Sequence, residues 1–207
     1  MLDSNFRDSY QKVLINPLLK LKFIKKIDPN FVTILSTFFG IFSFFLIISD
    51  HKYLAVLTLL ISGYLDTLDG SIARISNNSS NIGAILDIFS DRIVEMLIIV
   101  ALFLVDPIDR SFLSILMISS SYLCITSFLV VGIFFQNSSE KSFYYSTGMI
   151  ERTEAFIFFI AMIVFHKYFK ILALTFSVLV FLTAFIRVCQ LLLSKERSMS
   201  CSSNRFR

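Results

Sequence analysis

The stretch that decides the architecture is residues 66–91, which read DTLDGSIARISNNSSNIGAILDIFSD. It places four aspartates within or beside segments that are otherwise apolar enough to span a membrane: Asp66, Asp69, Asp87 and Asp91. An aspartate at the centre of a spanning helix costs about 2.5–3.5 kcal/mol on insertion scales. Ionisable residues inside a membrane therefore indicate a functional site.

The spacing of these aspartates predicts that their carboxylates converge. Asp66 and Asp69 are three residues apart and share one face of a helix, and Asp87 and Asp91, four apart, share a face of the next helix. Two neighbouring antiparallel helices, joined by the polar link SNNSSN, can bring all four together. Such a cluster repels itself unless cations balance it, and carboxylate oxygens suit hard cations such as Mg²⁺ or Mn²⁺. Because four negative charges balance two divalent cations, we expect a dinuclear metal site.

The fixed positions of this stretch resemble the signature of the CDP-alcohol phosphotransferase (CDP-alcohol phosphatidyltransferase) family. In this sequence the signature reads Asp66-x2-Asp69-Gly70-x2-Ala73-Arg74-x8-Gly83-x3-Asp87-x3-Asp91. The resemblance implies a membrane enzyme of phospholipid biosynthesis. Such an enzyme transfers a substituted phosphate group from a CDP-linked lipid, typically CDP-diacylglycerol, to an alcohol and releases CMP. The alternative is a pair of helices with incidental acids.

The resemblance also implies roles for the individual residues. Asp66, Asp69 and Asp87 would be metal ligands. Asp91 would be a ligand or neighbour of the second metal and also the general base for the incoming hydroxyl. Small residues let a nucleotide approach the backbone, and an arginine can hold phosphate with a fork of donors. The positions expected to bind the CDP moiety are Asp66, Asp69, Gly70, Ala73, Arg74 and Gly83.

Three basic residues outside the signature resemble the positions that hold the acceptor's phosphate in members that use inositol phosphate. They are Lys141, Arg152 and Arg187. Three converging cations in an apolar setting would repel unless an anion joined them. A phosphorylated polyol, such as inositol phosphate or glycerol phosphate, supplies that anion. However, the run ERTEA has Ala155 where the ERPER pattern of those enzymes has a second basic residue, so the acceptor stays open.

Other functions and other roles compete with these assignments. An aspartate/magnesium prenyltransferase also activates a pyrophosphate, but more spanning helices and a different Asp-rich pattern are typical of it. A cation transporter would distribute its carboxylates over several helices and through the bilayer. For Lys141 the alternative role is an ordinary loop charge, and for Arg187 it is snorkelling to the interface. For Arg152 the alternative is pairing with Glu151 or Glu154.

The composition indicates an integral membrane protein of one domain. Of the 207 residues, 56% are hydrophobic and only 16% are charged, with a mean hydropathy of +0.76. A soluble domain averages about 25% charged residues. The net charge of +4 does not indicate a nucleic-acid partner, because the lysines and arginines flank apolar segments. That pattern is typical of a cytoplasmic membrane face.

The apolar runs predict an all-α protein with a six-helix domain over residues 29–194. A basic amphipathic arm at 1–28 is expected to form an interfacial helix, and 195–207 are expected to form a flexible cytoplasmic tail. The start of the domain, DPNFVTILS, resembles the Thr-Pro-Asn-x-x-Thr opening of the family's first helix, with Asp28 in place of Thr. The six expected spans are 31–49, 53–75, 82–105, 111–135, 150–166 and 170–193.

The distribution of basic residues places both termini and the aspartates on the cytoplasmic side. His51 and His166 then fall in short links at the opposite face, where a lone histidine is an interfacial anchor. The three cysteines have no metal-ligand spacing. No cleavable signal peptide is expected from the polar and basic first residues. The partners expected are the two substrates and the bilayer, and a homodimer is one option for the oligomeric state.

Overall fold

The computed structural model describes residues 28–76, 80–135 and 152–203, which form helices joined by short links. No strand occurs in these ranges. The helices are α3 (Pro29–Ile48), α4 (Lys52–Ile75), α5 (Asn81–Val105), α6 (Pro107–Phe135), α7 (Arg152–Val164), the 3₁₀ turn η3 (His166–Tyr168) and α8 (Phe169–Ser203). Each of the six segments predicted from the apolar runs overlaps one of the helices α3 to α8. The all-α class is confirmed for the described residues.

Four helices are long and apolar enough to cross a membrane: Pro29–Ile48, Lys52–Arg74, Pro107–Ile133 and His166–Leu193. The protein is therefore an integral membrane protein. Helix α7 has 13 residues, fewer than the roughly 20 needed to span a bilayer. Helix α5 has 25 residues but carries the charged side chains of the site. A total of six spans stays a prediction.

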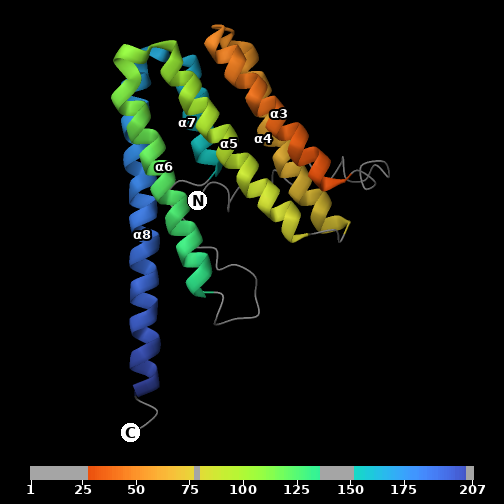
Figure 1. Ribbon diagram of the computed structural model, residues 1–207. Coiled ribbons are helices and arrows are strands. Elements are labelled where there is room, and N and C mark those ends of the chain that lie inside the picture. The colour runs from red at the N-terminus through yellow and green to blue at the C-terminus, as the bar shows by residue number, and fades with distance from the viewer. Residues whose placement is uncertain (1–27, 77–79, 136–151, 204–207) are drawn as a thin grey trace.

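Two regions predicted from the sequence lie partly outside the described residues. The expected interfacial arm at 1–28 lies outside the described residues, apart from Asp28. The range expected to form the tail, 195–207, begins inside α8, because that helix continues to Ser203 and extends beyond the other helices (Figure 1). Its flexibility stays a prediction.

The helices pack in two groups that meet at α5. Helix α3 contacts both α4 and α5, while α6 packs along α8 and also contacts α5. Helix α7 contacts α4, α5 and α8. In Figure 1 the start of α3, the end of α4 and the start of α5 lie at the same end of the bundle. This arrangement brings the two halves of the aspartate signature together.

Small and polar residues hold α3 against its neighbours. The hydroxyls of Ser43 and Thr58 lie 2.7 Å apart, and the Ser36 hydroxyl donates to the Ser62 carbonyl at 2.8 Å. Hydrogen bonds of this kind join helices in lipid, where the hydrophobic effect contributes little to association. Gly40 lets α5 approach, because a Cβ there would lie only 2.4 Å from Cγ2 of Val94.

Local signals in the sequence explain where α3 and α5 begin. Asp28 precedes Pro29, and its Oδ1 accepts a hydrogen bond of 3.0 Å from the amide of Asn30. Ser80 likewise accepts from the amide of Gly83 at 3.0 Å. Aspartate and serine are favoured caps because their oxygens satisfy amides that have no partner within the helix. Both starts lie at the end of the bundle that holds the aspartates.

Candidate active site

Three of the four signature aspartates converge between α4 and α5. One carboxylate oxygen each from Asp66, Asp69 and Asp87 lies within 4.8 Å of the other two. Asp66 is 9% exposed and Asp69 is 4% exposed. Helices α4 and α5 both pack on α3, and the end of α4 lies with the start of α5 at one end of the bundle (Figure 1). This arrangement produces the convergence that the spacing predicted for these three residues.

The fourth aspartate is joined to the cluster through an arginine. Arg152, the first residue of α7, forms ion pairs through its two terminal nitrogens, Nη1 with Oδ2 of Asp66 and Nη2 with Oδ1 of Asp91. The side chain of Asp91 is 14% exposed and that of Arg152 is 35% exposed. Arg152 therefore bridges the two helices of the signature at the carboxylate cluster.

A residue on α3 completes the surroundings of the cluster. The Thr33 hydroxyl donates to Oδ2 of Asp69 at 2.5 Å, and both side chains are buried. The hydroxyl oxygen of Thr33 also lies 3.2 Å from the Pro29 carbonyl oxygen, so the hydroxyl proton has two acceptors in reach. Thr33 was not singled out as a site residue from the sequence. The signal that could have found it is the DPNFVT opening, where it is the final threonine.

The chemistry of the cluster fits a divalent cation. All its donors are carboxylate oxygens, which are the ligands preferred by Mg²⁺ and Mn²⁺. The buried Oδ1 of Asp87 has no hydrogen-bond donor within the described chain. A buried charged oxygen without a donor is costly, and a cation removes that cost. Asp66, Asp69 and Asp87 are thus positioned to hold metal.

The small residues of the signature have different surroundings. A Cβ added to Gly70 would meet no atom within 4 Å, so the backbone there is open to a close approach. At Gly83 a Cβ would lie 3.0 Å from Oδ1 of Asn30, which indicates tight packing against α3. Ala73 is half-buried, and the exposed Arg74 donates to the Ser71 hydroxyl at 3.2 Å.

Two of the three residues expected to bind an acceptor phosphate are described, and they make different contacts. Lys141 lies outside the described residues. Arg152 lies at the aspartates, whereas Arg187 on α8 contacts α6. The Arg187 Nη1 is 3.5 Å from Sγ of Cys124, and its guanidinium carbon is 5.7 Å from the centre of the Phe128 ring. Its buried Nε has no hydrogen-bond partner within the described part of the chain.

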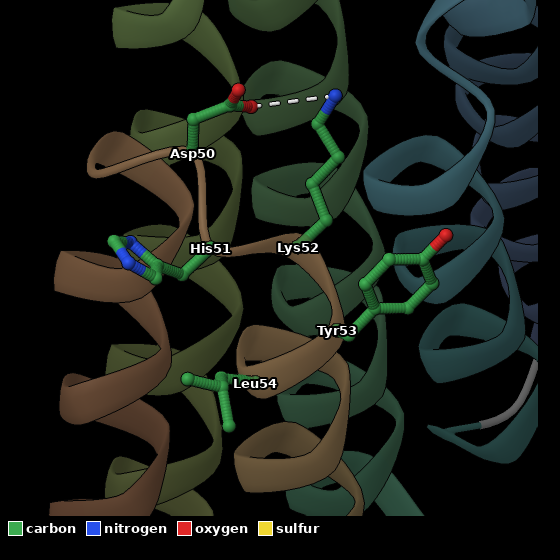
Figure 2. Close-up of a pocket in the computed structure, with 5 residues that line it drawn as sticks. All are labelled: Asp50, His51, Lys52, Tyr53 and Leu54. Atoms are coloured by element: carbon green, nitrogen blue, oxygen red, sulfur yellow. Dashed lines mark ion pairs between the residues drawn. The ribbon is translucent and has the colours of Figure 1, made fainter.

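A pocket of about 300 Å³ lies at the other end of α4, lined by Asp50, His51, Lys52, Tyr53 and Leu54 (Figure 2). Lys52 pairs with Asp50 at 3.3 Å, and Nδ1 of His51 lies 2.8 Å from the Ser49 carbonyl. Along the helix, Lys52 is about 20 Å from Asp66. This pocket is therefore separate from the carboxylates, and its polar groups have local partners.

Comparison with known proteins agrees with the signature. The family model described as CDP-alcohol phosphatidyltransferase matches residues 26–192. The phosphatidylinositol phosphate synthase of Corynebacterium glutamicum is 28% identical over 150 residues, which cover 70% of this chain and 67% of that protein. The CDP-diacylglycerol–inositol 3-phosphatidyltransferase of Candida albicans is 34% identical over 107 residues, which cover 50% of this chain and 46% of that protein. The match thus spans about half the length of the Candida relative.

A solved structure has a similar fold. It is the crystal structure of Mycobacterium tuberculosis phosphatidylinositol phosphate synthase with CDP-DAG bound. The TM-score is 0.61 and the identity 19%, and the similarity covers 85% of this chain and 90% of that chain. With the family model covering most of the sequence and the aspartates converging as its signature requires, this chain belongs to the CDP-alcohol phosphatidyltransferase family.

Proposed function

We propose that this protein is a transferase that moves a phosphatidyl group from a CDP-linked lipid, such as CDP-diacylglycerol, to the hydroxyl of an alcohol. The observation that carries the proposal is the convergence of Asp66, Asp69 and Asp87 within 4.8 Å, in a membrane protein of this family. A bond forms between the acceptor oxygen and the β-phosphorus of the CDP-lipid. The bond from that phosphorus to the CMP oxygen breaks, and CMP leaves.

The carboxylates would hold two divalent cations, Mg²⁺ or Mn²⁺, with Asp91 contributing to the second. When bound, such cations neutralise the pyrophosphate and stabilise the charge that develops during phosphoryl transfer. The open backbone at Gly70 leaves room for the nucleotide beside the carboxylates. Arg74 and Ala73 follow on the same helix, and Arg74 supplies donors for phosphate oxygens.

Asp91 is the proposed general base. It lies one helical turn beyond Asp87 on α5, next to the metal ligands. There its carboxylate takes the proton of the acceptor hydroxyl as the oxygen attacks phosphorus. Its Oδ1 forms an ion pair with Nη2 of Arg152.

The proposed acceptor is a phosphomonoester, either inositol phosphate or glycerol phosphate. Two features support this proposal. Arg152 presents a fork of donors beside the base, and such forks match phosphate geometry. The Corynebacterium relative is by name a phosphatidylinositol phosphate synthase. Arg187 is the proposed second phosphate contact and Lys141 the third. The active site and both termini would face the cytoplasm, in line with the distribution of basic residues along the sequence.

The decisive experiment measures CMP release by the purified full-length protein with CDP-diacylglycerol and a panel of acceptors. We expect inositol phosphate or glycerol phosphate to support turnover, and free inositol and serine to support little. Chelation should abolish CMP release, and added Mg²⁺ or Mn²⁺ should restore it. Full activity in excess chelator would contradict the metal site, and preference for an unphosphorylated alcohol would contradict the proposed acceptor. A cation transporter or a prenyltransferase would release no CMP with any acceptor.

A further inference from the structure

We infer that Arg152 is a counter-ion shared between the carboxylate cluster and the anionic group of the acceptor, so that metal binding and acceptor binding reinforce each other. The acceptor half of this inference rests on the proposed function. The metal half rests only on the ion pairs of Arg152 with Asp66 and Asp91.

Helix packing delivers Arg152 to the carboxylates. Phe156 lies one turn after Arg152 on α7 and packs on α4 at Gly63, where a Cβ would come within 3.0 Å of its ring. Arg152 lies one turn before Phe156 on α7, and Asp66 lies one turn after Gly63 on α4. Because the two helices run in opposite directions, Arg152 and Asp66 lie beside each other. The antiparallel register of these two helices places the guanidinium over the signature.

Arg152 and a divalent cation compete for the same carboxylates. Arg152 holds Oδ2 of Asp66 and Oδ1 of Asp91, and Asp66 is one of the three residues whose oxygens converge. Two cations a few ångströms apart repel, most strongly where the surroundings are poor in water. A metal at the cluster therefore weakens the hold of Asp66 and Asp91 on Arg152. Without metal, Arg152 offsets part of the repulsion among the acids.

An anionic acceptor gives the displaced guanidinium a new partner. A phosphomonoester offers oxygens with the geometry that the carboxylates had offered. Because the Arg152 side chain is 35% exposed, it can reorient toward such a ligand without opening the helix pair. Linkage then requires that each ligand strengthen the binding of the other.

The same exchange would select the acceptor. While Arg152 is paired with Oδ1 of Asp91, a cation occupies the side of the carboxylate that the acceptor hydroxyl must approach. A phosphomonoester that draws Arg152 away frees this oxygen of Asp91 at the moment the acceptor hydroxyl arrives. A neutral alcohol leaves the ion pair in place. Arg152 is thus a positioning residue that makes access to Asp91 depend on the charge of the acceptor.

The test measures Mn²⁺ binding to the purified full-length protein without CDP-lipid, by counting free Mn²⁺ with electron paramagnetic resonance. For the wild type we expect inositol phosphate to lower the Kd for Mn²⁺ at least about fivefold, the usual lower range of allosteric coupling, and free inositol to leave it unchanged. Arg152→Gln should bind Mn²⁺ at least about fivefold more tightly than the wild type when no acceptor is present, and should show no further effect of inositol phosphate.

Two further variants keep the test selective. Lys170→Gln also removes one positive charge, but at a side chain that is 61% exposed and pairs with Asp109 at 2.6 Å; it should bind Mn²⁺ as the wild type does. Arg152→Lys keeps the charge without the fork, and we expect an intermediate Kd, which gives a measurement even if Arg152→Gln does not fold. The inference is overturned if neither inositol phosphate nor glycerol phosphate lowers the wild-type Kd, or if Arg152→Gln matches the wild type. CMP release is measured separately, so a failure of the proposed reaction can be distinguished from a failure of this exchange.

Discussion

Thr33→Val should slow catalysis by weakening the placement of Asp69. The substitution keeps the shape of the side chain and removes the hydroxyl that donates to Oδ2 of Asp69 at 2.5 Å. Both residues are only 4% exposed, so water does not readily replace the lost donor. A hydrogen bond to a charged group contributes about 1.5–3 kcal/mol. If the loss of this hydrogen bond raises the activation free energy by the whole of that amount, the rate of CMP release falls about 10- to 150-fold.

The assay is the initial rate of CMP release at saturating substrates, together with the Kd for Mn²⁺. We expect Thr33→Val to lower the rate and to raise the Kd for Mn²⁺, because Asp69 is one of the converging carboxylates. Thr33→Ser keeps the hydroxyl and should recover most of the rate of CMP release and most of the affinity for Mn²⁺. Thr37→Val is the matched control, since that hydroxyl lies one turn away and donates to the backbone carbonyl of Thr33 at 2.8 Å.

Two results would refute this reasoning. One is a Thr33→Val rate within about twofold of the wild type with an unchanged Kd for Mn²⁺. The other is a Thr33→Ser variant that is as slow as Thr33→Val, which would assign the effect to packing and not to the hydroxyl. A loss of activity in Thr37→Val of the same size would also show that the effect is not specific to Asp69.

Three further predictions follow from the same geometry. Asp91→Asn should retain binding of the CDP-lipid, measured at equilibrium, while turnover falls by several orders of magnitude; turnover near the wild-type rate would exclude Asp91 as the base. Arg187→Ala should raise the apparent KM of the acceptor far more than that of the CDP-lipid; equal changes, or a loss of thermal stability alone, would assign Arg187 to packing against α6. Gly40→Ala should lower the melting temperature, because the added Cβ would clash with Val94 on α5. It would lie 2.4 Å from Cγ2, 2.9 Å from Cγ1 and 3.2 Å from Cβ of that valine, and rotation of the valine side chain cannot relieve all three contacts. Gly70→Ala is its control, with no atom within 4 Å of the added Cβ, and an equal loss of stability there would contradict the packing argument.

Much of the fold could be predicted from the sequence, because the forces that define it are local. Apolar runs of about 20 residues bounded by polar links predict helices in a membrane, and the segments expected at 31–49, 53–75 and 82–105 match α3, α4 and α5 closely. Asp28 and Ser80 mark helix starts by their capping oxygens.

The aspartate cluster could be predicted for a related reason. The helical period places Asp66 with Asp69, and Asp87 with Asp91, on shared faces, and only residues 76–80 separate the end of α4 from the start of α5 along the chain. The sequence by itself therefore determined the class of the protein, its family and the carboxylates of its candidate active site. The convergence of Asp66, Asp69 and Asp87 confirms what the spacing predicted for these three.

Only the tertiary structure decided which distant side chains meet the carboxylates. Arg152 reaches Asp66 and Asp91 because Phe156 packs at Gly63, and Thr33 reaches Asp69 because α3 lies against α4. Sequence motifs mark both residues, but they do not specify these contacts, since each contact depends on the register between two separate helices. In lipid that register is set by close packing and by a few interhelical hydrogen bonds, which the hydropathy of a single segment does not encode.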